Sequence, residues 1–435
     1  MKIKPFNWLI YLVILVFTMD YFRYVFISVA GGSSYYVLMV VAFAACLMKS
    51  RSVLINITFK RYAVYFYVWC CAFIIVYGFV ATSQYYQDLF GISMDLFAYQ
   101  MIIMLVVFTI VTTVIHLQDD DLSRTIIKLV IISMIINAIL TLRALVTNPN
   151  IARLIATGQS VNDADSFYGI SGFAIIYGLL TIVPMFFPFF HGQNKRYSIF
   201  SAVFLILMGI FIFSAGFTTA IMILASTLII YPMMRLSKIK IFILAPIYGA
   251  ILYFWGNIQT LYNILNYLAE IIPIQEVSKR FYQLALYLAF NDASGDALMA
   301  RSVAYQRSLS AFIEYPLTGK IIFSPDYPLS GHSTILDTMG GLGIGGLLLF
   351  ILFLVYNYKF STRTIVDTKW KSAVFTSHIA FAGVCVLNPI VSSPVIVMMF
   401  MIFTHIFPAY MISNKWDQTQ KMQQSKPIKN DQAVI

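Results

Sequence analysis

Charge is scarce in this 435-residue chain: Asp, Glu, Lys and Arg make up 11% of it, and hydrophobic residues make up 60%. The mean hydropathy is +0.82. Soluble globular domains carry about 25% charged residues, so this composition excludes that class and predicts an integral membrane protein. Acidic residues are the rarer charged kind, with 18 Asp and Glu against 29 Lys and Arg. In a membrane protein an excess of basic residues commonly indicates which loops are cytoplasmic. We therefore expect no nucleic-acid partner.

Cysteine is also rare, and metal-binding patterns are missing from the polar segments. The four cysteines (Cys46, Cys70, Cys71 and Cys385) all lie inside apolar runs. This placement excludes a disulfide framework and a zinc site built on cysteine spacing. The outer polar segments hold no His/Cys/carboxylate set at metal-ligand spacing, so we expect no metal and no cofactor. A signal-peptidase site does not follow the first apolar run, which is therefore interpreted as a retained helix.

Long apolar runs dominate what is present. A bilayer core needs about 20 apolar residues per helix, and about twelve runs meet or approach this length. They lie near 6–29, 34–48, 62–80, 96–117, 124–147, 168–190, 197–214, 216–234, 239–258, 333–357, 372–388 and 390–411. The sequence thus predicts an all-α polytopic membrane protein with about twelve transmembrane helices. One large outer loop, 259–331, interrupts them.

Basic residues indicate the orientation of these helices. With a cytoplasmic N-terminus, most Lys and Arg fall in alternate short segments such as 49–61, 235–240 and 359–371. This agrees with the positive-inside rule and places the lysine-rich C-terminal tail in the cytoplasm. We therefore divide the chain into transmembrane helices over 1–258, an outer loop over 259–331, further transmembrane helices over 332–413, and a cytoplasmic tail over 414–435.

A smaller set of basic residues breaks this pattern because it falls on the outer side. Its members are Arg23, Arg143, Arg153, Lys279, Arg280, Arg301, Arg307 and Lys320. Insertion disfavours positive charge on that side, so its retention indicates a role. For Arg23, three residues after Asp20 on a helix, the role predicted is an ion pair within the first helix.

The large loop carries helical patterns of its own. Residues 258–268 and 277–290 have the apolar spacing of amphipathic helices that lie on a membrane surface. A third helix is predicted over 297–313, and Pro316 follows its end.

His332 is the histidine that the charge pattern places on the outer side, at the start of a transmembrane helix. Imidazole titrates near neutral pH, which suits a general base acting on a hydroxyl group. The alternative is a helix-capping histidine with no catalytic role.

Arg280, Arg301 and Arg307 are candidates for binding a pyrophosphate, because guanidinium groups match phosphate oxygens in pairs and keep their charge. The alternative is contact with lipid headgroups, or ion pairs with Asp292, Asp296 or Glu314.

The glycine cluster at 340–346 does not indicate a nucleotide site, because it lies inside a membrane helix with no preceding strand. Small residues there let helices approach closely or let the backbone bend beside a cavity.

These residues occur in a specific order along the chain. Arg280 comes first, then Ser294-Gly295 with Arg301, then Pro316-Leu317-x-Gly319. Gly331-His332-Ser333 and Gly343-x-Gly345-Gly346 follow. This order resembles the O-antigen ligase and Wzy-type polysaccharide polymerase superfamily, whose pattern runs Arg, Arg, Pro-Leu-x-Gly, His-Asn/Ser and a glycine-rich helix.

The resemblance implies metal-independent glycosyl transfer from an undecaprenyl-pyrophosphate-linked donor, at the outer face of a bacterial plasma membrane. It implies that His332 is the base and that Arg280 and Arg301 hold the pyrophosphate. Family members also carry a Ser-Arg at the outer start of a middle helix, where this chain reads Ser214-Ala215-Gly216-Phe217-Thr218. Arg143, Arg153 and Arg307 are the candidates to replace that missing arginine.

The function we expect is polymerisation of lipid-linked polysaccharide repeat units of O-antigen or capsule. The partners would be the lipid-linked donor and acceptor, membrane lipid and a chain-length regulator. An O-antigen ligase is the alternative within the family. A flippase or exporter of lipid-linked oligosaccharide is the alternative from another class, although such transporters commonly show two related halves, which this sequence lacks.

Overall fold

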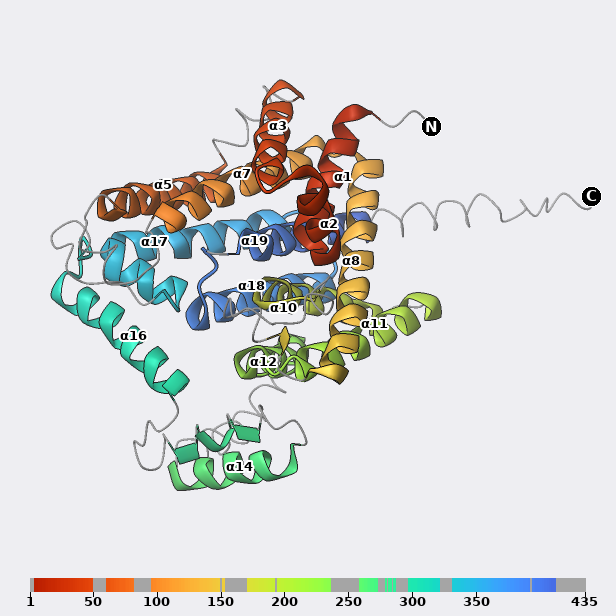
Figure 1. The fold of residues 1–435 in the computed structure, drawn as a ribbon. Coiled ribbons are helices and arrows are strands. Elements are labelled where there is room, and N and C mark those ends of the chain that lie inside the picture. Colours follow the sequence, from red (N-terminus) through yellow and green to blue (C-terminus); the bar gives the residue numbers. More distant parts are fainter. Residues whose placement is uncertain are drawn as a thin grey trace, which may run out of the picture.

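The computed structural model describes most of the chain, namely residues 4–49, 60–81, 95–148, 151–152, 170–191, 194–235, 258–272, 278–279, 281–283, 285–286, 296–320, 331–391 and 393–411. Regular structure in these residues is entirely helical (Figure 1). The expected all-α class is therefore confirmed for the part of the chain that is described.

The first half of the chain forms the helices α1 (Pro5–Thr18), α2 (Asp20–Ala30), α3 (Ser34–Lys49), α5 (Arg61–Ala81), α7 (Asp95–Leu117), α8 (Asp120–Thr147), α10 (Phe173–Ile182), the 3-10 helix η2 (Val183–His191), α11 (Lys195–Ser214) and α12 (Thr218–Met233). The second half forms α14 (Ile258–Ile271), α16 (Asp296–Glu314), α17 (Thr334–Thr362), α18 (Thr368–Leu387), α19 (Pro394–Met401) and the π-helix η3 (Ile402–Ile406).

Seven of the described helical segments are long and apolar enough to cross a membrane, or eight if the bent pair α1–α2 is one span. The seven are 100–117, 120–147, 173–190, 195–214, 334–362, 368–387 and 394–411, and shorter apolar helices cover 34–49, 61–75 and 218–233. A membrane-embedded protein follows from these helices. The expected span 239–258, except for Ile258 at the start of α14, and the tail 414–435 lie outside the described residues, so the total of about twelve spans stays a prediction.

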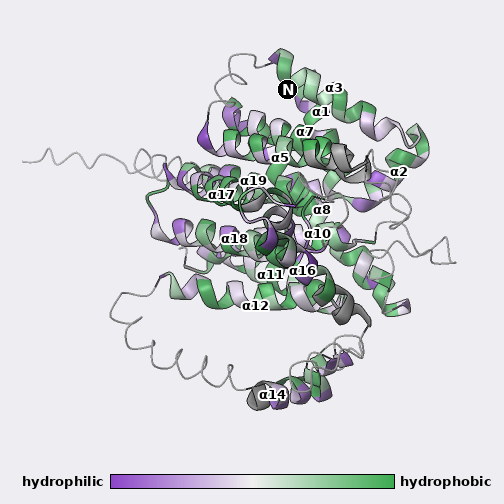
Figure 2. Cartoon of the chain, turned by 90° about the vertical axis from the view of Figure 1, so that its left-hand side faces the viewer, coloured by the Kyte–Doolittle hydropathy of each residue, from purple (hydrophilic) through white to green (hydrophobic). Residues whose placement is uncertain are grey.

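Aromatic side chains fill the centre of the packed helices. Phe66 of α5 stacks on Phe108 of α7 with ring centroids 4.2 Å apart, and Phe353 of α17 lies 4.7 Å from Phe66. All three side chains are fully buried. Hydrophobic residues predominate along these helices (Figure 2), and many large ones are exposed, as expected where lipid replaces water.

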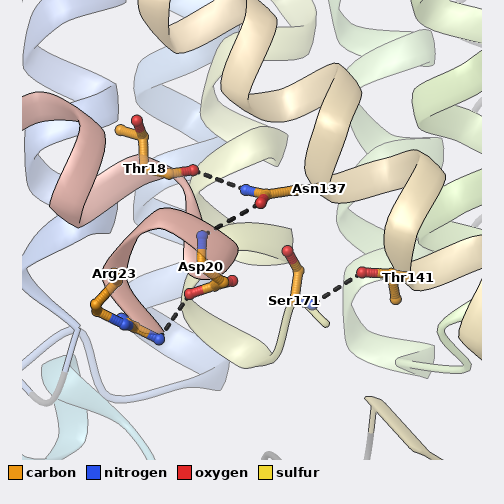
Figure 3. Close-up of polar contacts among 6 residues, drawn as sticks. All are labelled: Thr18, Asp20, Arg23, Asn137, Thr141 and Ser171. Atoms are coloured by element: carbon orange, nitrogen blue, oxygen red, sulfur yellow. Dashed lines mark hydrogen bonds and ion pairs between the residues drawn. The ribbon is translucent and has the colours of Figure 1, made fainter. Parts of the chain in front are cut away.

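The first predicted span, 6–29, is not one helix: α1 and α2 meet at a bend of 111° at Met19. Asn137 of α8 supplies the hydrogen bonds at this break. Its Nδ2 donates to Thr18 O at 2.7 Å, and its Oδ1 accepts from Asp20 N at 3.3 Å (Figure 3). The predicted Asp20–Arg23 pair is confirmed, with 2.6 Å between Arg23 Nη2 and Asp20 Oδ1.

Helices also form in the predicted loop 259–331. α14 and α16 confirm the helices expected at 258–268 and 297–313, and the described residues within 277–290 are helical. α16 packs on α17, whereas α14 lies at the edge of the molecule in both views (Figures 1 and 2). Their place on a membrane surface stays a prediction.

Candidate functional site

The segment Pro316–Lys320 is built into a break in α17. In an unbroken α-helix, the amide of Ile344 would donate to the carbonyl of Gly340. Here Ile344 N donates to Pro316 O at 2.7 Å, and Gly340 O accepts from Lys320 N at 2.8 Å. The loop therefore takes the place of one helical hydrogen bond and satisfies both of the groups that the break exposes. We call this arrangement, residues 316–320 with 340–344, the loop–helix clamp.

Glycine makes the clamp sterically feasible. Gly319 and Gly343 have φ angles of +72° and +63°, in the left-handed region that residues with a Cβ rarely adopt. A Cβ on Gly319 would overlap the main chain of Gly341, and a Cβ on Gly343 would overlap that of Leu317. The glycine cluster was predicted to allow close approach or a bend. Both occur, and the approaching segment is the Pro-Leu-x-Gly of the same chain.

The side chain of Lys320 makes a structural contact within this loop. Its side chain is buried, and its Nζ lies 2.8 Å from Glu314 Oε2 at the end of α16. The hydrogen bond from Lys320 holds the pKa of the exposed Glu314 carboxyl below its usual value, with a smaller contribution from Tyr315. Lys320 thus belongs to an ion pair that joins the end of α16 to the clamp.

His332 lies directly before Ser333, the N-cap of α17, and its side chain is exposed. Hydrogen bonds to the connection between α18 and α19 hold the start of α17 in place. Thr334 N and Thr334 Oγ1 both donate to Asn388 O at 3.2 Å, and Ile390 N donates to Thr334 Oγ1 at 2.7 Å. Because Asn388 and Ile390 lie between α18 and α19, His332 is carried on a helix start that a second helix pair holds in place.

Two buried polar residues at this junction were not identified from the sequence. Asp337, in the first turn of α17, is 5% exposed and accepts a hydrogen bond from Ser308 Oγ of α16 at 2.8 Å. Asn388 is 2% exposed, and within the described part of the chain its Nδ2 has no hydrogen-bond partner. An acid in a first helical turn is ordinarily a surface residue that offsets the helix dipole, so nothing in the sequence marked Asp337 as buried.

The other predicted site residues are only partly described. Arg307 lies on α16, exposed, next to Ser308, and Arg143 is exposed near the end of α8. Arg301 lies on α16, but its side chain falls outside the description, as do Arg280 and Arg153 entirely. The structure therefore brings the helix that carries Arg301 and Arg307 against the helix that His332 precedes.

This arrangement places an exposed imidazole at the N-terminus of a 29-residue helix, with arginines on the adjoining α16. A helix N-terminus and guanidinium groups both favour anions, and an imidazole can take a proton from a hydroxyl group. Binding of an anionic group beside a general base stays a prediction, because the side chains of Arg301 and Arg280 lie outside the described part of the chain.

No protein-family model matches the chain, and no curated protein matches it. The resemblance to the ligase and polymerase superfamily is accordingly carried by the order and spacing of the motifs in this sequence.

Proposed function

We propose that this protein is a polymerase of lipid-linked polysaccharide repeat units, of O-antigen or capsule, in the plasma membrane of a bacterium. The observation that supports this most is the loop–helix clamp. Two parts of the family-like pattern, Pro-Leu-x-Gly and the glycine-rich helix, make main-chain contact, and His332 stands at the start of the same helix. Motifs that occurred by chance would have no reason to meet in this way.

In the proposed reaction, His332 takes the proton of a sugar hydroxyl on the incoming lipid-linked unit. The hydroxyl oxygen forms a bond to the anomeric carbon of the donor glycan. The bond from that carbon to the pyrophosphate oxygen breaks, and undecaprenyl pyrophosphate leaves with the electron pair. Arg301 and Arg280 stabilise the charge that builds on the leaving group, with Arg307, Arg153 and Arg143 in support.

The test is a glycan ladder from a deletion strain complemented with wild type, His332→Ala or His191→Ala. Wild type restores the ladder, and His332→Ala collapses it to single units, since loss of a general base lowers the rate about 10²–10⁴-fold. His191→Ala is the matched control, because the charge pattern puts His191 on the cytoplasmic side, and it should keep the ladder. A full ladder from His332→Ala, at equal membrane expression, would overturn the mechanism.

The same deletion strain distinguishes the two other functions. An O-antigen ligase predicts that finished chains accumulate on their lipid carrier and are not attached. A flippase predicts that single lipid-linked units stay on the cytoplasmic leaflet. A polymerase predicts single units that reach the outer side and are still attached to their acceptor.

A further inference from the structure

Two of the five histidines, His378 and His405, meet inside the bundle, and His116 stacks on Phe360, the ring that also packs on His405. They come from separate segments: His116 from α7, His378 from α18 and His405 from η3. Asn357 of α17 lies between His378 and His405, and Ser361 of the same helix contacts His405. Thr334 and Asn357 are at opposite ends of α17, and an unbroken helix between them would rise about 35 Å. The cluster is thus a second polar site on the helix that carries the first.

The hydrogen bonds assign the protons on two of these rings. His378 Nδ1 lies 2.8 Å from Val374 O, so this nitrogen carries the proton, because a carbonyl can only accept. His378 Nε2 then accepts from Asn357 Nδ2 at 3.0 Å. His405 Nε2 lies 2.8 Å from Asn357 Oδ1 and so donates. Both rings are neutral in this arrangement, and they have opposite tautomers.

Ser361 completes the arrangement. Its Oγ donates to Asn357 O at 2.7 Å, which leaves a lone pair free to accept. The same oxygen lies 3.4 Å from His405 Nδ1, the ring nitrogen that carries no proton, and 3.2 Å from His405 Nε2, which carries one. Ser361 Oγ can therefore accept from either nitrogen of His405, whichever carries the proton.

We infer that His378, Asn357 and His405 form a membrane-embedded binding site for one proton. The proton comes from water and binds to His378 Nε2. The Asn357 amide turns over, so that Oδ1 accepts from His378 and Nδ2 donates to His405 Nε2. The Ser361 hydroxyl, within reach of both His405 nitrogens, takes the proton from Nε2 and gives its own to Nδ1, and the new Nδ1–H then donates to Ser361 Oγ. One proton has been gained, and every hydrogen bond of the group is replaced by another.

The backbone around His405 is specialised as well. Residues 402–406 form a single turn of π-helix, a feature that recurs at functional sites because it offsets a side chain from the regular helical position. An ionisable side chain inside a membrane is energetically costly, and such residues commonly mark functional sites. Both His378 and His405 are buried.

The groups facing the cluster set the balance between its two states. Tyr62 of α5 stacks on His405 at 5.9 Å, and Tyr358 of α17 meets the edge of His378 at 5.5 Å. These aromatic faces favour an imidazolium ion. His116 and Arg363, which stack on Phe360 next to His405, disfavour it when charged, and Arg124 of α8 lies over Tyr410 beyond η3. This inference does not depend on the proposed glycan chemistry.

The test is ¹⁵N-histidine NMR of the full chain in lipid nanodiscs, with signals assigned from His378→Gln and His405→Gln. At about pH 8, where imidazole is neutral, we expect one ring protonated on Nδ1 and the other on Nε2. On titration to about pH 4, both rings should change in one concerted step, with the His405 proton moving between nitrogens. The His332→Ala variant should behave as wild type in this titration.

An Asn357→Leu variant should abolish the concerted step and leave two independent rings. If that variant does not fold, the wild-type spectra alone decide the matter. The inference is overturned if both rings show the same tautomer, if they titrate separately in wild type, or if neither changes before circular dichroism reports unfolding.

Discussion

Glycines in the clamp and directly beside it are under very different steric constraints. Gly319 has a positive φ, and the main chain of Gly341 occupies the space where a Cβ would go. Gly345 lies on the same stretch of α17 and has nothing within 4 Å of an added Cβ. A methyl group would therefore meet immovable backbone at one position and open space at the other.

We expect Gly319→Ala to destabilise the protein by roughly 1–3 kcal/mol or more, the cost of a strained backbone position. Gly345→Ala should be neutral or stabilising by up to about 1 kcal/mol, because alanine favours a helix. Thermal unfolding in the same detergent compares the two variants. Equal midpoints would contradict the close approach of the loop to α17.

Glu314 and Lys320 carry a pH dependence of stability. Because the hydrogen bond from Lys320 lowers the pKa of Glu314, the pair stabilises the fold above the ordinary carboxyl pKa of about 4.3. That contribution is lost as the pH falls through the lower, folded-state pKa. The melting temperature of wild type should therefore be higher than that of Glu314→Gln at pH ~7, and this difference in melting temperature should shrink below pH ~4. A difference that stays constant across this range would show that the charge is not involved.

At the scale of the element, α16 and α17 depend on each other through buried polar contacts. Ser308 Oγ donates to Asp337 at 2.8 Å, and Tyr305 Oη of α16 donates to Leu387 O at the end of α18 at 3.0 Å. These bonds fix the face that α16 turns to α17, and thereby the side on which Arg307 is exposed. A helix positioned by apolar packing alone could rotate more easily.

Removing the hydroxyl of Ser308 should therefore be costly. We expect Ser308→Ala to lose about 1–3 kcal/mol, since a buried Asp337 oxygen loses its donor. Ser310→Ala, an exposed serine on the same helix, should stay within about 0.5 kcal/mol of wild type. Chemical unfolding monitored by tryptophan fluorescence measures both. If the two variants were alike, the contact with Asp337 would not hold α16 in place.

At the scale of the whole molecule, α17 should connect the two sides of the membrane. His332 precedes it, and the exposed Val366 follows it. In a background with the four cysteines replaced by serine or alanine, an impermeant maleimide should label His332→Cys in intact spheroplasts. Val366→Cys should be labelled only after the membrane is permeabilised. Labelling of both sites in intact spheroplasts would contradict the predicted orientation.

The sequence predicts those parts of this molecule that depend on neighbouring residues. The length of the apolar runs and the distribution of charge predicted the helices, and the i,i+3 spacing predicted the Asp20–Arg23 ion pair. The bend at Met19 was missed because its cause, Asn137, is more than a hundred residues away. The histidine cluster was missed for the same reason, since each histidine alone resembles an ordinary residue inside a helix. Contacts between distant segments leave no local pattern to find.

The loop–helix clamp also constrains how the protein is made. Residues 316–320 are synthesised before α17, so the loop cannot contact that helix until the helix has formed. Until the two meet, Ile344 N can donate to Gly340 O as in an unbroken helix, so neither group lacks a partner. The break at Gly343 is therefore expected to form only when residues 316–320 reach α17, which makes this loop a prerequisite for the final shape of that helix.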